Sequence, residues 1–344
     1  MSVEILQGDC RDILKTMPDQ SVNCCVTSPP YFGLRDYGVA GQIGLEATPD
    51  TYVAELVAVF AEVRRVLRDD GTLWLNLGDS FWGSGQGFGD TKTTNKGHSG
   101  SRERKKPEWA NVGLKPKDLI GIPWRVAFAL QADGWYLRRD IIWHKPNPMP
   151  ESVTDRCTSA HEYIFHFSKS PKYYYDAAAI AEDGVTGDMR RPYGSQGANE
   201  LDPRGKQGEG KLRKDVDKQR GHSRRHAGFN DRWDAMSREE QGSGKRNKRS
   251  VWTVATKPFK GAHFATFPPD LIEPCILAGC PVGGTILDPF GGAGTTGLVA
   301  DRNGRSAILI ELNSDYAAMA SKRIHDDAPM FSNQTQVIPI ETTP

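Results

Sequence analysis

The chain has 344 residues, of which 38% are apolar and 25% charged, so it can form one large α/β domain with insertions or two modest domains. Its formal net charge of +1 excludes a uniformly basic molecule, and a nucleic-acid surface would require local segregation of charge. The N-terminus lacks a signal-peptide pattern, no apolar run approaches the roughly 18 residues of a membrane span, and the six cysteines form no CxxC pair. We therefore expect a cytoplasmic protein without a zinc ribbon.

Apolar strands and an amphipathic helix alternate in the first 80 residues. The apolar run at 21–27 indicates a buried strand that stops at two prolines, because proline cannot continue a central strand. The predicted elements, in order, are a strand at 3–6, one or two helical turns at 10–17, a strand at 21–27, a helix at 51–68 and a strand at 72–77. This order favours a parallel α/β sheet.

Two polar regions interrupt the alternation. Gly, Ser, Thr and Lys dominate residues 81–112, which we interpret as a long loop. Residues 181–250 contain 17 Lys and Arg against 12 Asp and Glu, a net charge of +5. This second region is either a weakly ordered insertion or a segment that orders on the DNA phosphate backbone, and the two interpretations are compatible. Between the two regions, the sequence predicts a helix at 117–133 and strands at 135–143 and 161–168.

The final third returns to alternating strands and helices. The predicted elements are a helix at 269–280, a strand at 285–287, a glycine turn at 291–294, a helix at 295–303, a strand at 306–310 and a helix at 314–325. We interpret residues 331–344 as a tail.

The glycine turn FGGAG at 290–294 joins a predicted strand to a predicted helix. Missing Cβ atoms allow the backbone to approach a ligand closely, and a helix N-terminus offers unpaired N–H groups. Glu311, about 20 residues beyond the turn, ends the next strand, where an acid can accept hydrogen bonds from ribose hydroxyls. The spacing differs from the G-x-G-x-x-G of dinucleotide folds. A tight turn in any doubly wound protein is the alternative interpretation.

The tetrapeptide Ser28-Pro29-Pro30-Tyr31 follows a strand, and ligands of open α/β sheets collect at the carboxyl edge of the strands. The prolines make the segment stiff and leave its carbonyls as acceptors. An aromatic amine is a poor nucleophile because its lone pair is delocalised into the ring. The Ser28 hydroxyl and the Pro29 carbonyl can accept its two N–H groups and favour a more tetrahedral nitrogen, while Tyr31 can stack on the base. A proline-ended strand with Tyr31 in the core is the alternative.

Together, the tetrapeptide and the glycine turn resemble the amino-methyltransferases that act on cytosine N4 or adenine N6 of DNA, in their β-class order. In that order the catalytic tetrapeptide comes first, the recognition region lies between, and the cofactor turn comes last. The resemblance implies a Rossmann-like α/β fold, with a mostly parallel sheet, helices on both faces and, here, polar loop insertions. It also implies S-adenosylmethionine as cofactor, double-stranded DNA as partner and a flipped base as substrate.

The resemblance also assigns roles to single residues. Asp9 and Cys10 belong to a segment similar to the acidic motif that contacts the adenosine part of the cofactor. Residues 263–268 are similar to the H-P-A-x-F-P segment on the methionine side, with Phe264 where proline is usual. The cofactor-binding residues expected in the second half of the chain are Phe264, Thr266, Asp288, Pro289, Phe290, Gly292, Gly294 and Glu311, and the catalytic residues are Ser28, Pro29, Pro30 and Tyr31.

The domain organisation and the DNA contacts combine this resemblance with the local charge of residues 181–250, since that region and the polar loop match no family motif. A solvated loop is the alternative for every basic residue named as a contact. The expected DNA contacts are Arg35 in the catalytic loop and Lys245, Arg246, Lys248 and Arg249 in the basic insertion. The expected parts are a catalytic half at 1–80 continued at 113–180, a polar loop at 81–112, a target-recognition region at 181–250, a cofactor-binding half at 251–330 and a tail at 331–344. A homodimer, a cognate restriction endonuclease and a bacterial or phage origin are further expectations.

Ser28 in the first position of the tetrapeptide favours cytosine N4, because adenine enzymes more often carry Asp or Asn there; adenine N6 is the alternative. Methyl transfer from a sulfonium needs neither metal nor strong base, since the leaving group is neutral. We therefore expect no metal and interpret His161-Glu162 and residues 143–146 as structural or DNA-facing. A nicotinamide oxidoreductase, a non-catalytic DNA-binding protein with a vestigial cofactor fold, and an RNA or protein methyltransferase are the competing hypotheses.

Overall fold

The chain divides into two compact units, one formed by Met1–Ile180 with Arg249–Pro344 and the other by Ala181–Lys248. In the second unit, the described residues include a two-stranded antiparallel ribbon of β6 (Glu182–Asp183) and β7 (Lys245–Arg246). The computed structural model describes residues 1–83, 113–183, 245–257, 267–327 and 335–340.

One large sheet organises the first unit, and nine of its strands lie in the described part of the chain. In spatial order they are β11 (Thr335–Pro339), β1 (Val3–Gln7), β10 (Ser306–Glu311), β9 (Thr285–Asp288), β2 (Val22–Thr27), β3 (Leu67–Leu77), β5 (His161–Ser168), β4 (Tyr136–His144) and β8 (Val251–Thr253). Every neighbouring pair is parallel except the two that include β5. The carboxyl ends of eight described strands therefore meet at one edge, where β5 begins.

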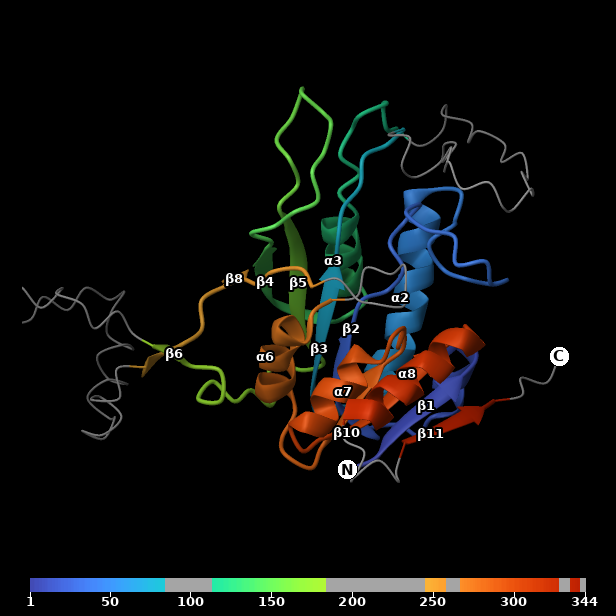
Figure 1. The fold of residues 1–344 in the computed structure, drawn as a ribbon, viewed down its shortest axis with the longest axis vertical. Coiled ribbons are helices and arrows are strands. Elements are labelled where there is room, and N and C mark those ends of the chain that lie inside the picture. Colours follow the sequence, from blue (N-terminus) through green and yellow to red (C-terminus); the bar gives the residue numbers. More distant parts are fainter. Residues whose placement is uncertain (84–112, 184–244, 258–266, 328–334, 341–344) are drawn as a thin grey trace, which may run out of the picture. The chain divides into compact units, whose positions relative to one another are not determined.

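Helices cover both faces of this sheet (Figure 1). Along β2, Cys25 faces one core whereas Cys24 and Val26 face the other, as the alternation of a doubly covered strand requires. The first face carries α1 (Cys10–Thr16), α2 (Pro49–Val66) and α3 (Ile122–Ala132), and the second carries α6 (Pro269–Gly279), α7 (Thr295–Arg302) and α8 (Ser314–Asp327). The predicted mostly parallel sheet with helices on both faces is confirmed.

Helix α3 begins later than its apolar pattern predicts. Lys117 has a φ angle of 75° and Gly121 one of 79°, so the chain is not helical at either position. Gly121 has no side chain to cap the helix, and Asp79, which follows β3, supplies the cap instead. Its Oδ1 accepts the N–H groups of Gly121 at 3.0 Å and Ile122 at 3.1 Å. A residue distant in the sequence thus sets the start of α3.

Two segments, residues 331–344 and residues 81–83, differ from what the sequence predicts. The range 331–344 is not simply a tail, because residues 335–339 form β11, parallel to β1. Of the predicted polar loop at 81–112, only residues 81–83 are described, and there Phe81 bridges to Leu119 while Trp82 is buried. Within the described residues, no helix is long and apolar enough to cross a membrane.

Candidate functional site

The carboxyl edge of the sheet carries a cavity that collects residues from both ends of the chain. Asp9 follows β1, Ser28 follows β2, Pro289 follows β9 and Glu311 ends β10. These strands are neighbours in the sheet, so the turns after them converge although the residues lie far apart in the sequence. The predicted site residues that line this cavity are Asp9, Cys10, Ser28, Pro29, Pro30, Tyr31, Arg35, Pro289, Phe290, Gly292 and Glu311.

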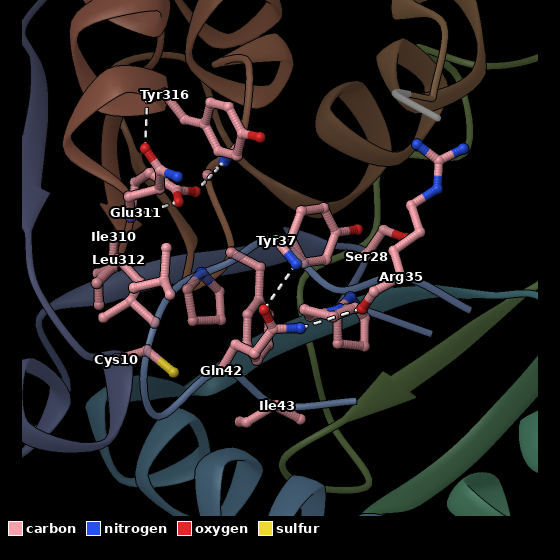
Figure 2. Close-up of a pocket in the computed structure, with 18 of the residues that line it drawn as sticks. Cys10, Ser28, Arg35, Tyr37, Gln42, Ile43, Ile310, Glu311, Leu312 and Tyr316 are labelled. Atoms are coloured by element: carbon pink, nitrogen blue, oxygen red, sulfur yellow. Dashed lines mark hydrogen bonds between the residues drawn. The ribbon is translucent and has the colours of Figure 1, made fainter. Parts of the chain in front are cut away.

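The catalytic loop after the tetrapeptide, in which Arg35 is a predicted DNA contact, forms another wall of the cavity (Figure 2). Gln42 organises this loop, because its side chain accepts from the Tyr37 N–H at 2.7 Å and donates to the Arg35 carbonyl at 3.1 Å. Tyr37 and Tyr316 both line the cavity. Neither residue is among the predicted cofactor contacts: Tyr37 lies in the catalytic loop and Tyr316 on α8 (Ser314–Asp327).

The N–H groups of all three glycines in the turn are bonded within the protein. Gly291 donates to the Ile310 carbonyl at 2.8 Å, and Gly294 donates to the Gly291 carbonyl at 2.8 Å. Gly292 donates to Glu311 Oε2 at 2.7 Å. A pyrophosphate in a dinucleotide fold is bound by such N–H groups. These three glycine N–H groups are therefore not available to a pyrophosphate as the turn stands.

Glu311 is held in place by backbone groups. Besides the Gly292 N–H, its carboxylate accepts the N–H of Asn313 at 2.8 Å. Burial raises the pKa of Glu311 above its ordinary value, and these hydrogen bonds offset part of that shift. Each carboxylate oxygen has two lone-pair sites, so the group retains acceptor capacity for ligand hydroxyls.

Asp288 does not line the cavity, so its direct contact with the cofactor stays a prediction. Its side chain is 1% exposed and accepts the hydroxyls of Thr27 and Thr296, each at 2.6 Å. Thr27 immediately precedes the tetrapeptide, and Thr296 lies in the first turn of α7. Asp288 therefore connects the strand that delivers Ser28 to the helix that follows the glycine turn.

Gly294 does not line the cavity either, and its cofactor contact likewise stays a prediction. It has a φ angle of 74°, and a Cβ added there would lie 2.8 Å from the Cβ of Ala320 on α8. Its lack of a side chain serves the packing of α7 against α8. Gly292 differs, because a Cβ there would meet nothing closer than the Phe290 carbonyl oxygen at 3.8 Å. Gly292 leaves room for a ligand.

Asp9 caps helix α1 and also forms an ion pair with Arg11. It caps α1 by accepting the Arg11 N–H at 2.8 Å, and its two oxygens accept from the Arg11 guanidinium at 2.6 and 3.0 Å. Burial acts to raise the pKa of Asp9, but the bonds and charge of Arg11 outweigh it and hold the pKa below its ordinary value. Arg11 also donates to the Gly41 carbonyl at 2.7 Å, which fixes the loop over the cavity.

The tetrapeptide is anchored from α2 and from the sheet. The buried Tyr52 donates its hydroxyl to the Pro30 carbonyl at 2.7 Å. The hydroxyl of Tyr31 donates to Glu162 Oε2 at 2.7 Å. Glu162 lies at the start of β5, which runs opposite to the other described strands, and the pairing of β5 with β3 and β4 brings it to this edge. No local sequence pattern predicts this contact.

Several predicted residues are not part of the cavity lining or fall outside the described residues. Phe264 and Thr266 are outside the described residues, although the neighbouring Phe267 lines the cavity. Lys245, Arg246 and Lys248 belong to the second unit, where Arg246 forms an ion pair with Glu182 at 3.1 Å. Arg249 belongs to the first unit, and its carbonyl accepts from Trp252 Nε1 at 2.7 Å.

The cavity lining is not the basic surface that a phosphate would require. Glu311 supplies negative charge, Asp9 is ion-paired with Arg11, and Arg35 is the one basic residue among the described lining residues. Apolar and aromatic side chains make up much of the remaining wall. This combination suits ribose hydroxyls and a sulfonium, whereas a pyrophosphate would require a basic lining.

Comparison with known proteins agrees with this geometry. The N6/N4 DNA methylase family model matches residues 22–322, a span that includes both the tetrapeptide and the glycine turn. The chain belongs to the N6/N4 DNA methylase family. It is a DNA methyltransferase of that family, as its strand order and both motifs predict.

Curated relatives resemble the chain over most of its length. The type II methyltransferase M.XycI of Xanthomonas campestris pv. cyanopsidis is 45% identical over 320 residues, which cover 93% of this chain and 87% of that protein. M.Cfr9I of Citrobacter freundii is 43% identical, covering 94% of this chain and 88% of that protein. M.SmaI of Serratia marcescens is 44% identical, covering 94% of this chain and 91% of that protein.

Solved structures share the fold at lower sequence identity. The PvuII DNA methyltransferase, which is cytosine-N4-specific, has a TM-score of 0.57 at 17% identity and covers 100% of this chain and 97% of its own. A DNA modification methylase of Thermus thermophilus, in complex with S-adenosyl-L-methionine, has a TM-score of 0.55 at 23% identity and covers 98% of this chain and 99% of its own. These similarities confirm the α/β methyltransferase fold.

Proposed function

We propose that the chain transfers the methyl group of S-adenosylmethionine to the exocyclic N4 amino group of a flipped cytosine in double-stranded DNA. One observation carries the proposal: the tetrapeptide 28–31 and the glycine turn line the same cavity at the carboxyl edge of the sheet. Asp288 links the elements that carry them through Thr27 and Thr296. A cofactor and an extruded base in this cavity would be adjacent.

The cavity residues fit the cofactor. Glu311 can accept hydrogen bonds from ribose hydroxyls, and Asp9 supports the nucleoside part of the cavity. Gly292 leaves the space beside the turn open, with Phe290 next to it. When bound, S-adenosylmethionine supplies an electrophilic methyl group on a sulfonium whose departure leaves a neutral thioether.

Ser28, Pro29 and Tyr31 act on the substrate amine. The Ser28 hydroxyl and the Pro29 carbonyl accept the two N–H groups, so the nitrogen becomes more tetrahedral and its lone pair is free to attack. The stiffness of two successive prolines fixes these acceptors, and Tyr52 holds the carbonyl of Pro30. Ser28 orients the amine without deprotonating it, and the proton leaves to solvent after transfer.

The preference for cytosine rests on Ser28. A hydroxyl can orient an amine but is a poor proton acceptor, and Ser in this position resembles the N4-cytosine enzymes. Adenine N6 is the second candidate, because its exocyclic amine is held by the same pair of acceptors. Modified-nucleoside analysis distinguishes the two.

DNA is contacted by Arg35 near the substrate and by the basic residues 245–249 in this proposal. Residues 181–250, with a net charge of +5 from 17 basic and 12 acidic residues, form the target-recognition region. The assembly and partner expected from the family are a homodimer and a cognate restriction endonuclease.

Tritium transfer from labelled cofactor to DNA, RNA or protein tests the substrate class. We expect labelled DNA from the wild-type chain, no labelled DNA from Ser28→Ala or Tyr31→Ala, and unchanged cofactor affinity in both variants by calorimetry. Label in RNA or protein but not in DNA would contradict the proposal. A Ser28→Ala variant with every property intact would support a non-catalytic DNA-binding protein.

A further inference from the structure

Behind the tetrapeptide, hydrogen bonds from two strands converge on the hydroxyl of Tyr31. This hydroxyl lies 2.7 Å from Glu162 Oε2 and 3.2 Å from Asn76 Oδ1. Asn76, on β3, is 4% exposed and donates through Nδ2 to the Tyr163 carbonyl at 3.0 Å and to the same Glu162 oxygen at 3.3 Å. The outer end of the Tyr31 ring is therefore held by groups from β3 and β5.

The second carboxylate oxygen of Glu162, Oε1, also has a partner. It accepts from Lys145 Nζ in an ion pair whose side chains are 18% and 16% exposed. Lys145 Nζ lies 4.3 Å from the centre of the Trp143 ring, and Trp143 donates its indole N–H to the Val254 carbonyl at 2.8 Å. A pair with so little exposure is only weakly screened by salt, so it keeps a fixed carboxylate beside the Tyr31 hydroxyl.

The other parts of the Tyr31 ring are also constrained. A Cβ added to Gly78 would lie 2.5 Å from Cε2 of Tyr31, so the ring packs directly on the backbone of that glycine. Two prolines and the Tyr52 bond to Pro30 fix the preceding backbone. Burial and the negative charge of Glu162 raise the pKa of Tyr31, which keeps the phenol protonated and able to donate.

We propose that Glu162 and Lys145 are positioning residues for methyl transfer, which hold the ring of Tyr31 where the target base is placed against it. The inference rests on the proposed catalytic role of the tetrapeptide. The position of the base sets the position of its amine relative to the acceptors of Ser28 and Pro29. A loosened ring would misplace the amine and slow turnover without altering the cofactor cavity.

A double-mutant cycle tests the coupling of Glu162 to the Tyr31 hydroxyl. Initial rates of methyl transfer to unmodified bacterial genomic DNA are measured for Glu162→Ala, Tyr31→Phe and the double variant. We expect each single variant to lower kcat about tenfold or more, with KM for the cofactor within about twofold of wild type. The double variant should lose little more than the worse single variant, because both changes remove the same hydrogen bond between Tyr31 and Glu162. A double variant whose kcat falls by the product of the two single-variant reductions would overturn the inference.

A conservative variant of Glu162 and a control variant elsewhere distinguish a positioning role of Glu162 from a contribution to stability alone. Glu162→Gln keeps an acceptor for the Tyr31 hydroxyl but leaves Lys145 unpaired. We expect it to retain more turnover than Glu162→Ala even where its melting temperature is lower. Turnover that follows melting temperature across these variants would contradict a positioning role. Glu62→Gln, which breaks a pair with Arg65 at 2.8 Å on α2, should leave kcat unchanged.

The outcomes also distinguish this inference from the function on which it rests. A Tyr31→Ala variant with full activity would contradict the catalytic role of the tetrapeptide. An inactive Tyr31→Ala variant together with a fully active Glu162→Ala variant would contradict the positioning role alone.

Discussion

Two carboxylates at the sheet edge, Asp288 and Glu311, have different roles. Glu311 and Asp288 are both carboxylates at strand ends, and burial raises the pKa of each. Asp288 accepts hydrogen bonds from two threonine hydroxyls and one backbone N–H and does not line the cavity. Glu311, in contrast, lines the cavity. The first therefore stabilises the junction of strand and helix, and the second is available to a ligand.

Cofactor affinity should depend on the ionisation of Glu311. Its pKa is raised, so it takes up a proton at a higher pH than an ordinary glutamate and then loses acceptor capacity for ribose hydroxyls. We expect affinity to fall as the pH is lowered through this raised pKa. Glu311→Gln should weaken binding about tenfold and remove that pH dependence, as measured by calorimetry. Glu273→Gln on α6 is the control, and an unchanged pH profile in Glu311→Gln would refute the assignment.

At the scale of elements, the connection from β9 to α7 contains two glycines with positive φ angles and separate tasks. Gly292, at 50°, has open space beside it, whereas Gly294, at 74°, packs against Ala320. The same substitution should therefore produce different defects at positions so close together in the chain.

Gly292→Val should lose cofactor affinity before stability, because its side chain enters the open space of the cavity. Gly294→Val should lose stability first, by about 2 kcal/mol or more, since it forces α7 away from α8 in addition to the strain of its backbone. Thermal unfolding and cofactor calorimetry on both variants measure the two effects. Normal cofactor binding by Gly292→Val would show that the cavity is not the cofactor site.

Local patterns predicted most of these elements, and long-range contacts account for the rest. The strand at 161–168 and the turn at 290–294 carry their own apolar and glycine signals, and both are found as predicted. The start of α3 depends on a cap from Asp79, and the task of Asp288 depends on Thr27, 261 residues away. The link from Tyr31 to Glu162 likewise depends on the reversed direction of β5.

At the scale of the whole molecule, the cavity and the most basic region belong to different compact units of the chain. The cavity lies in the first unit, and the region with a net charge of +5 lies mostly in the second, Ala181–Lys248. Since the chain as a whole carries a net charge of +1, this segregation concentrates positive charge in the insertion. DNA affinity should therefore depend on the insertion more than on total charge.

Replacing Lys245, Arg246, Lys248 and Arg249 with Gln should weaken DNA binding and flatten its salt dependence. Each lost phosphate contact should reduce the slope of log K against log salt by about 0.9. Arg246 should contribute least, because Glu182 already neutralises it. Lys322→Gln, an exposed position on α8, is the control for loss of charge alone. An unchanged slope in the fourfold variant would identify the run as a solvated linker.

We propose that the cavity between the tetrapeptide and the glycine turn is where an amino group of a DNA base is methylated. Mass spectrometry of nucleosides from the DNA of cells that express the chain measures this reaction and its product. We expect N4-methylcytosine with the wild-type chain and none with Tyr31→Ala. N6-methyladenine in its place would contradict the assigned base, and equal methylation by Tyr31→Ala would contradict the assigned site.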